Sequence, residues 1–252
     1  TDYGFSVALD PTDCSRLYVG AGFQRIRLTT DAGATWTPLG NGMLNGNGAV
    51  GSLVFDPSNP ATMWATTYGG PVSKSVDGGV NWTEMTFTSG TSSAQVEVDP
   101  FDPQVVIVAN GDTATGAQSW RTTDGGANWS PLAAPFPMET QAGVAFDATR
   151  QGVVLMTSDR TTEGVFRSTD HGATWTRVHT RPMRFVGVHP ASGEAYAGNA
   201  DGMIRSTDGG QTWARIPGMP TGLRRIVFDP VDANHIVVGA HSGAFVTFTK
   251  FR

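Results

Sequence analysis

Cysteine and long apolar runs are almost missing from this sequence. Cys14 is the single cysteine, so the chain cannot form an internal disulfide, and a metal site built on several thiolates is excluded. No apolar run approaches the roughly 18 residues that a membrane-spanning helix requires, and we expect no membrane span. The sequence begins at Thr1 rather than Met and shows no signal peptide, which we interpret as a processed or trimmed start.

Positive charge is also scarce. The chain has 17 Lys and Arg against 22 Asp and Glu, a formal net charge of -5, and no basic run. A protein that binds nucleic acid carries a cluster of basic residues, so we expect no nucleic-acid partner. The sequence contains no recognisable metal-ligand cluster, phosphate-binding loop or haem motif. We therefore predict neither a bound metal nor a cofactor.

One short pattern occurs five times in the chain. Each copy carries Ser or Thr, an Asp two residues later, then Gly, Thr or Asn, and Trp: TTDAGATW (29–36), SVDGGVNW (75–82), TTDGGANW (122–129), STDHGATW (168–175) and STDGGQTW (206–213). A catalytic site is made once, so a motif with five copies is architectural. We assign this structural role to Asp31, Trp36, Asp77, Trp82, Asp124, Trp129, Asp170, Trp175, Asp208 and Trp213.

Two further patterns keep the same period. Two apolar stretches each occur six times. The first ends in an Asp-Pro turn in four copies, clearest in LVFDPSNP (53–60), and in Asp-Ala (147–148) or His-Pro (189–190) in the other two; the second is a stretch such as TMWATT (62–67). These stretches are short, rich in Val and Ile, and bounded by Gly, Pro, Asp and Asn, which are strand and turn signals. No window long enough for a helix shows a helical apolar pattern. Four short strands every ~40–45 residues is the period of a propeller blade.

The predicted fold is therefore all-β: a single β-propeller domain, 1–252, of four-stranded antiparallel blades. We favour six blades, five of them with the repeated turn, and keep a seven-bladed ring as the alternative, because the last unit shows no fourth strand. The blades are expected at about 5–39, 50–85, 94–132, 142–178, 184–216 and 224–252.

The repeated pattern has a physical explanation in a tight turn between two strands. A hydroxyl such as that of Ser168 and a carboxylate such as that of Asp170 can accept hydrogen bonds from backbone N–H groups that would otherwise be unpaired. Gly172 suits a position with positive φ, and Trp175 can bury its ring between neighbouring sheets.

The pattern S/T-x-D-x-G-x-T/N-W resembles the Asp-box, or BNR repeat, of sialidases, xyloglucanases, sortilin-type receptor domains and photosystem II assembly factors. The pairing of the box with a V-x-x-D-P-x-N-P stretch is most similar to the xyloglucanase and sortilin branches. The resemblance implies a ligand on the face of the propeller away from the boxes. Because these families do different things, the resemblance is specific for the fold rather than for one activity.

Candidate functional residues were sought on the loops of that face. The second-to-third strand turns and the links between blades lie there, whereas the Asp-Pro turns and the boxes share the other face. As ligand-binding candidates we select Tyr68, Arg160, Asp201, His241 and Trp120. If the chain is a hydrolase, the available carboxylates are Asp112, Asp159, Glu163 and Asp201, although no catalytic residue is assigned.

The residues exclude one related activity and leave three functions open. Arg215-Ile216-Pro217 follows the last box, whereas the sialidases place Arg-Ile-Pro ahead of their first box, so we reject a sialidase. We favour a non-catalytic recognition module, secreted to the extracellular space or periplasm of a bacterium, that binds a glycan. The alternative is an inverting, xyloglucanase-like glycoside hydrolase or a fragment of one, and the third candidate is a protein-binding assembly scaffold.

Overall fold

The computed structural model describes residues 4–22, 25–39, 49–67, 70–85, 95–109, 118–132, 143–159, 164–229, 232, 235–240 and 245–249. The chain divides into two compact units, Thr1–Pro131 (unit 1) and Leu132–Arg252 (unit 2). The described residues form strands and no helix, as predicted, and so contain no helix long and apolar enough to cross a membrane.

Unit 1 contains three four-stranded antiparallel sheets, each with its strands in chain order. The first sheet consists of β1 (Gly4–Leu9), β2 (Leu17–Ala21), β3 (Arg25–Thr29) and β4 (Thr37–Leu39). The second consists of β5 (Val50–Asp56), β6 (Asn59–Thr67), β7 (Val72–Ser75) and β8 (Thr83–Glu84). The third consists of β9 (Gln95–Val98), β10 (Val106–Ala109), β11 (Trp120–Thr122) and β12 (Ser130–Pro131).

Unit 2 repeats this arrangement. Its first sheet is formed by β13 (Val144–Phe146), β14 (Val154–Thr157), β15 (Val165–Ser168) and β16 (Thr176–His179). Its second is formed by β17 (Phe185–Val188), β18 (Ala195–Asn199), β19 (Gly202–Ser206) and β20 (Ala214–Ile216). In the described residues the last sheet has three strands, β21 (Leu223–Phe228), β22 (His235–Ala240) and β23 (Phe245–Thr249).

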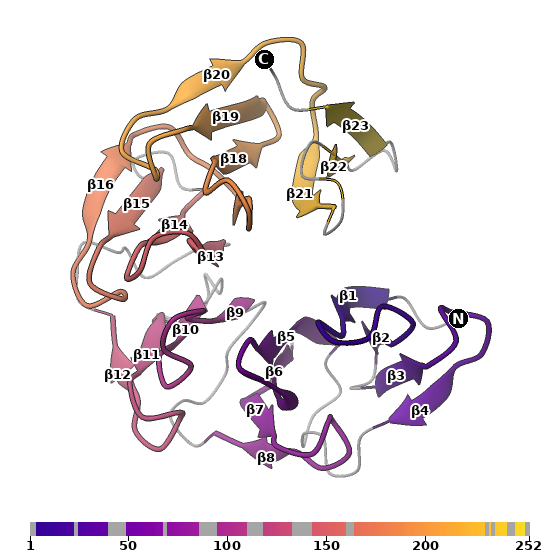
Figure 1. The fold of residues 1–252 in the computed structure, drawn as a ribbon. Helices are drawn as coiled ribbons and strands as arrows, with labels where there is room; N and C mark the ends of the chain where they lie inside the picture. The colour runs from indigo at the N-terminus through magenta and orange to yellow at the C-terminus, as the bar shows by residue number, and fades with distance from the viewer. Residues whose placement is uncertain are drawn as a thin grey trace. The chain divides into compact units, whose positions relative to one another are not determined.

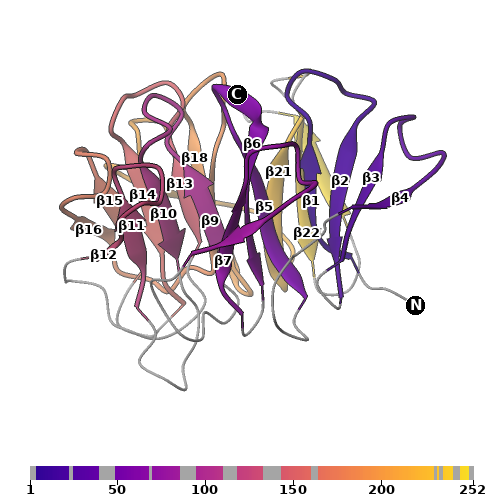
Figure 2. The same cartoon turned by 90° about the horizontal axis from the view of Figure 1, so that it is seen from below.

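Within each unit the sheets stack face to face on apolar side chains. In unit 1 the first strands β1, β5 and β9 are neighbours, and in unit 2 β13, β17 and β21 are neighbours (Figures 1 and 2). In unit 2, for example, Leu155 of one sheet packs with Ile204 of the next, and both are almost fully buried. Burial of such apolar area between sheets is the main stabilising contribution to this kind of fold.

The repeated turn is held by its own side chains. In the fourth copy, the Ser168 hydroxyl accepts the N–H groups of Gly172 and Asp170 at 2.9 and 3.2 Å. The Asp170 carboxylate accepts the backbone N–H of Thr174 at 2.8 Å and its hydroxyl at 2.6 Å. The Trp175 indole N–H donates to the Gly172 carbonyl at 3.0 Å. The other four copies form the same set of bonds, with Asn in place of Thr in two of them.

The backbone of the box explains its glycine. Gly172 has φ of 81°, as predicted, and the residue before it, His171, has φ of 57°. Residues other than glycine rarely adopt backbone angles in this left-handed region. Ala32 occupies the position of His171 in the first box with φ of 54°, whereas the other three boxes have Gly there.

Main-chain bonds fasten the first four boxes to the end of their own sheet where the first two strands are joined, and basic side chains tie the third and fifth boxes to the preceding sheet. The His171 N–H donates to the Gly152 carbonyl, in the turn between the first two strands of that sheet, at 2.9 Å. The basic residue before a box reaches the box of the following sheet. Lys74 donates to the Gly125 carbonyl at 2.8 Å, and Arg167 donates to the Gly209 carbonyl at 2.7 Å. These basic side chains are therefore part of the scaffold.

His189 replaces the aspartate of the Asp-Pro turn in the second sheet of unit 2. Its Nδ1 accepts the N–H groups of Ala191 and Ser192, each at 3.2 Å, as the Asp147 carboxylate accepts the N–H of Thr149 at 2.8 Å in the preceding sheet. The imidazole is buried and packs edge-on against the Phe228 ring. An imidazole nitrogen thus accepts the backbone N–H groups of this turn in place of a carboxylate.

We expect Ser168→Ala to lower the free energy of unfolding by about 1–3 kcal/mol, because it leaves the buried N–H of Gly172 without its acceptor. Urea unfolding followed by circular dichroism measures this loss. Thr169→Ala, at the exposed neighbouring position, is the matched control and should leave stability nearly unchanged. Equal effects of the two substitutions would contradict the role of the hydroxyl.

We also expect stability to fall between about pH 4 and pH 2. Hydrogen bonds from Thr35 lower the pKa of Asp31 to about 2, and hydrogen bonds from Asn128 lower that of Asp124 to about 2. A carboxyl whose pKa is lower when folded stabilises the protein above its unfolded pKa of about 3.9, and this contribution is lost as pH falls. Urea midpoints at pH 6, 4, 3 and 2 test this. The double variant Asp31→Asn, Asp124→Asn should show a shallower decline, and a wild-type midpoint constant from pH 5 to 2 would refute the prediction.

Candidate functional site

Three segments of unit 2 meet at the end of the sheets away from the boxes. They are the residues after β14, the link between β16 and β17, and the turn between β18 and β19. Main-chain bonds join them: the Met183 N–H donates to the Ser158 carbonyl at 2.8 Å, and the Arg184 N–H donates to the Gly198 carbonyl at 2.7 Å. The turns between second and third strands and the links between sheets are the segments on which we expected functional residues from the sequence.

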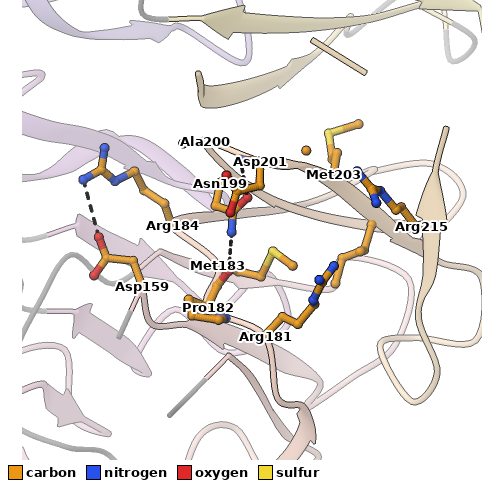
Figure 3. A pocket seen from close by; sticks show the side chains of 12 residues that line it. Asp159, Arg181, Pro182, Met183, Arg184, Asn199, Ala200, Asp201, Met203 and Arg215 are labelled. Carbon is orange, nitrogen blue, oxygen red and sulfur yellow. Dashed lines mark hydrogen bonds and ion pairs between the residues drawn. The ribbon is translucent and has the colours of Figure 1, made fainter. Parts of the chain in front are cut away.

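A pocket of about 630 Å³ lies where these segments meet (Figure 3). Its volume is within the roughly 300–1,000 Å³ range of ligand-binding pockets. The residues around it are Asp159, Arg181, Pro182, Met183, Arg184, Asn199, Ala200, Asp201, Gly202, Met203, Ile204 and Arg215. Charged side chains and buried apolar side chains thus share one cavity.

Asn199 holds the wall of the pocket together. Its side-chain amide donates to the Pro182 carbonyl at 2.6 Å, and its side-chain oxygen accepts the Asp201 N–H at 2.8 Å. One amide therefore joins the β16–β17 link to the β18–β19 turn and fixes the turn that carries Asp201.

Some charged side chains of the pocket are paired with each other and others are not. Asp159 forms an ion pair with Arg184 at 3.4 Å, with 22% and 28% of the two side chains exposed. Arg181, Arg215 and Asp201 are exposed, and none of them has an ion-pair partner among the described residues. In Figure 3, Arg184 and Asp159 lie on one side of the pocket and Arg181 and Arg215 on the other, with Asn199 and Asp201 between them.

His179 lies two residues before Arg181 and is linked to it. Its Nδ1 accepts the Arg181 N–H at 3.2 Å. Burial lowers the pKa of His179, and the nearby charge of Arg181 lowers it further. The imidazole is therefore neutral at pH 7 and adds no positive charge beside the pocket.

The structure brings together two of the residues selected from the sequence. Asp159 and Asp201 both line the pocket. Trp120 lies in unit 1, where its half-buried ring packs against an apolar cluster that includes Val96 and Val108. The remaining candidates lie outside the described residues: Tyr68, Asp112, Arg160, Glu163 and His241.

Sequence reasoning missed Arg184, Arg215 and Asn199. Arg184 lies in the link between β16 and β17, which was among the loops considered, but it was not selected there; Arg215 lies within β20, outside those loops. Arg215 pairs with Ile204 across β19 and β20, which brings the two residues to one wall.

Tyr196 belongs to the scaffold rather than to the pocket. Its buried hydroxyl donates to Glu194 at 3.0 Å, and Glu194 pairs with Arg205 at 2.6 Å. Burial and the adjacent Glu194 carboxylate raise the pKa of Tyr196. None of these three residues lines the pocket.

Comparison with known proteins defines the class. A family model described as Sortilin-Vps10, "Sortilin, neurotensin receptor 3", matches residues 70–192, and the BNR/Asp-box repeat model matches residues 204–215. The solved structure of an ancestral GH74 enzyme superposes with a TM-score of 0.78 at 18% identity, over 99% of this chain and 37% of that one. The structure of YCF48 bound to D1 peptide superposes with a TM-score of 0.69 at 14% identity, over 99% of this chain and 80% of that one.

The chain is an Asp-box repeat β-propeller, which confirms the fold class predicted from the repeats. The six blades and the single domain of residues 1–252 stay predictions. Its sequence relatives are glycoside hydrolases. It is 30% identical over 141 residues to a protein of Neosartorya fischeri named "Probable oligoxyloglucan-reducing end-specific xyloglucanase", covering 50% of this chain and 17% of that protein. It is 28% identical over 211 residues to a xyloglucanase of Paenibacillus sp, covering 66% of this chain and 20% of that protein. The chain thus spans about a fifth of the length of these relatives.

We expect Asn199→Ala to lower the free energy of unfolding by about 1–2 kcal/mol, since it removes two hydrogen bonds between segments. Amide hydrogen exchange at Asp201 should become faster, because its N–H loses its acceptor. Thr221→Ala, at an exposed position of the same unit, is the control. Unchanged exchange at Asp201 would show that the amide does not hold this turn.

Proposed function

We propose that this chain is a polysaccharide-binding propeller of a xyloglucanase-like glycoside hydrolase. The observation that carries the proposal is the sequence similarity to two xyloglucanases, at 30% and 28% identity, in a chain whose described part has a ligand-sized pocket away from the boxes. The likeness to GH74 structures adds the fold alone, at 18% identity.

The sequence alone led us to favour a non-catalytic recognition module. The comparisons favour the alternative, a glycoside hydrolase-like propeller, because the sequence relatives are named as hydrolases. Binding of a glycan is common to both interpretations, so it is the property that we assign first.

The pocket has part of the chemistry that hydrolysis needs. Inverting glycosidases use two carboxyl groups roughly 6.5–9.5 Å apart, one as acid and one to activate water. Asp201 has no ion-pair partner among the described residues and is the carboxylate that we assign to contact the substrate. Asp159 is engaged by Arg184, which suits a positioning role. We propose that complete hydrolysis requires a protein of the full length of the xyloglucanases, of which this chain spans about a fifth.

We further propose that the chain works outside the cell, in the extracellular space or the periplasm. Polysaccharides of the size that such hydrolases attack are found there. A sequence with one cysteine, Cys14, needs no disulfide to fold and is compatible with that environment.

Binding and hydrolysis of xyloglucan oligosaccharides by the purified chain are the test, by isothermal calorimetry and by release of reducing sugar. We expect saturable binding that Asp201→Asn weakens about 10–100-fold, because hydrogen bonds to a charged group contribute about 1.5–3 kcal/mol. Asp13→Asn, in an exposed turn of unit 1, is the matched control and should bind as wild type.

The outcomes separate the three functions. Sugar release would establish a hydrolase, and binding without release would establish a recognition module. Absence of binding to every glycan on an array would refute the proposal and leave the protein-binding scaffold. The likeness to YCF48 bound to D1 peptide does not itself favour that third function, because 14% identity shows the fold alone.

A further inference from the structure

Two arginines of the pocket face open space without a carboxylate. Arg181 and Arg215 are exposed and line the cavity, and neither guanidinium has a hydrogen-bond or ion-pair partner in the described part of the chain. Arg184, by contrast, is paired with Asp159 at 3.4 Å. Figure 3 shows the two unpartnered guanidinium groups on the side of the pocket opposite this ion pair.

Among the described residues of the pocket, the charges leave one net positive charge. Asp159 balances Arg184, and in this part of the chain Asp201 is the remaining carboxylate against Arg181 and Arg215. The planar fork of a guanidinium matches the two oxygens of a carboxylate. A ligand with a single negative charge balances this excess, whereas a doubly charged phosphate exceeds it.

The rest of the lining suits a sugar ring. Met183, Met203 and Ile204 are buried and give the cavity an apolar surface, against which the C–H face of a ring can pack. Asp201 is fixed by Asn199 and presents a carboxylate that can accept hydrogen bonds from ring hydroxyls. Apolar surface with a few placed polar groups is typical of carbohydrate and small-ligand pockets.

We infer that this pocket binds an acidic sugar: Arg181 and Arg215 bind the carboxylate of a uronic acid residue, and Asp201 accepts its hydroxyls. The inference rests on the proposed function in that the ligand is a carbohydrate. It departs from the neutral xyloglucan oligosaccharides of that test, because it assigns to the pocket a preference for a sugar that carries a carboxylate. A neutral glucan would leave both guanidinium groups unpaired in the complex.

The test compares two tetrasaccharides that differ at one position of each ring. β-1,4-linked tetraglucuronic acid and cellotetraose have the same backbone, with a carboxylate or a hydroxymethyl group at C6. We expect the 252-residue chain to bind the uronic acid at least about tenfold more tightly in calorimetry at low salt. The preference should shrink in 0.3 M NaCl, since salt screens exposed charges.

Variants identify the residues responsible. Arg181→Gln and Arg215→Gln should each weaken binding of tetraglucuronic acid about tenfold and leave that of cellotetraose unchanged. Arg225→Gln removes an exposed arginine of β21 outside the pocket and should have no effect. Thermal unfolding shows whether each variant is folded. Undiminished uronic acid binding by both folded pocket variants would overturn the inference.

Three further results distinguish failure of this inference from failure of the proposed function. Equal affinity for the two tetrasaccharides overturns the inference and leaves the proposed function standing. Binding of neither of them, nor of xyloglucan, overturns both. A tetrapeptide with a free terminal carboxylate that binds as tightly as the uronic acid would show that the pocket recognises a carboxylate without the sugar, and would also overturn the inference.

Discussion

In every sheet that carries a box, the turn between the third and fourth strands leaves backbone N–H groups that must find acceptors. The hydroxyl of Ser168 and the carboxylate of Asp170 supply them in the fourth copy, at 2.8–3.2 Å. The carbonyl groups of the same turns accept from the indole of the box and, through Lys74 and Arg167, from the sheet before. One eight-residue turn therefore closes its own hairpin and ties it to the adjacent sheet. An unpaired buried N–H costs more than the bond itself contributes, so substitution of these few side chains is expected to be disproportionately destabilising.

This concentration of constraints at one end of the sheets leaves the other end free to differ. In the described part of unit 2, bonds at the opposite end include those of Asn199 and of the main chain at Met183 and Arg184. Around them the side chains are charged and exposed, which a scaffold does not require. Such an arrangement, a rigid frame with variable loops, is where binding residues commonly occur in repeat folds.

The candidate site could be predicted only in part. Asp159 and Asp201 were found because they are charged residues on loops of the expected face, and the pocket contains both. Arg184 was not selected although it lies in a link of the expected face, because the sequence does not show that Asp159 comes within reach. Arg215 was missed because a charged residue within a strand is usually no more than a solvent-exposed position. Its importance appears only when the pairing of β19 with β20 brings Arg215 opposite Ile204 at the pocket wall. The loss of the Asp in the second Asp-Pro turn of unit 2 was visible in the sequence, but its replacement by the Nδ1 of His189 was not.

The repeat and the all-β fold could be derived from the strand and turn signals that recur along the chain. The chemistry of the box could be derived as well, because its hydrogen bonds join residues two to four positions apart. Such local hydrogen bonds recur whenever the same side chains recur at the same spacing. Only the tertiary structure decided which charges are neutralised and which are left open, since Asp159 and Arg184 are 25 residues apart and meet through the packing of two sheets. That Arg181 and Arg215 have no ion-pair partner among the described residues is a property of that packing, because a short-range pattern does not record which distant carboxylate comes within reach.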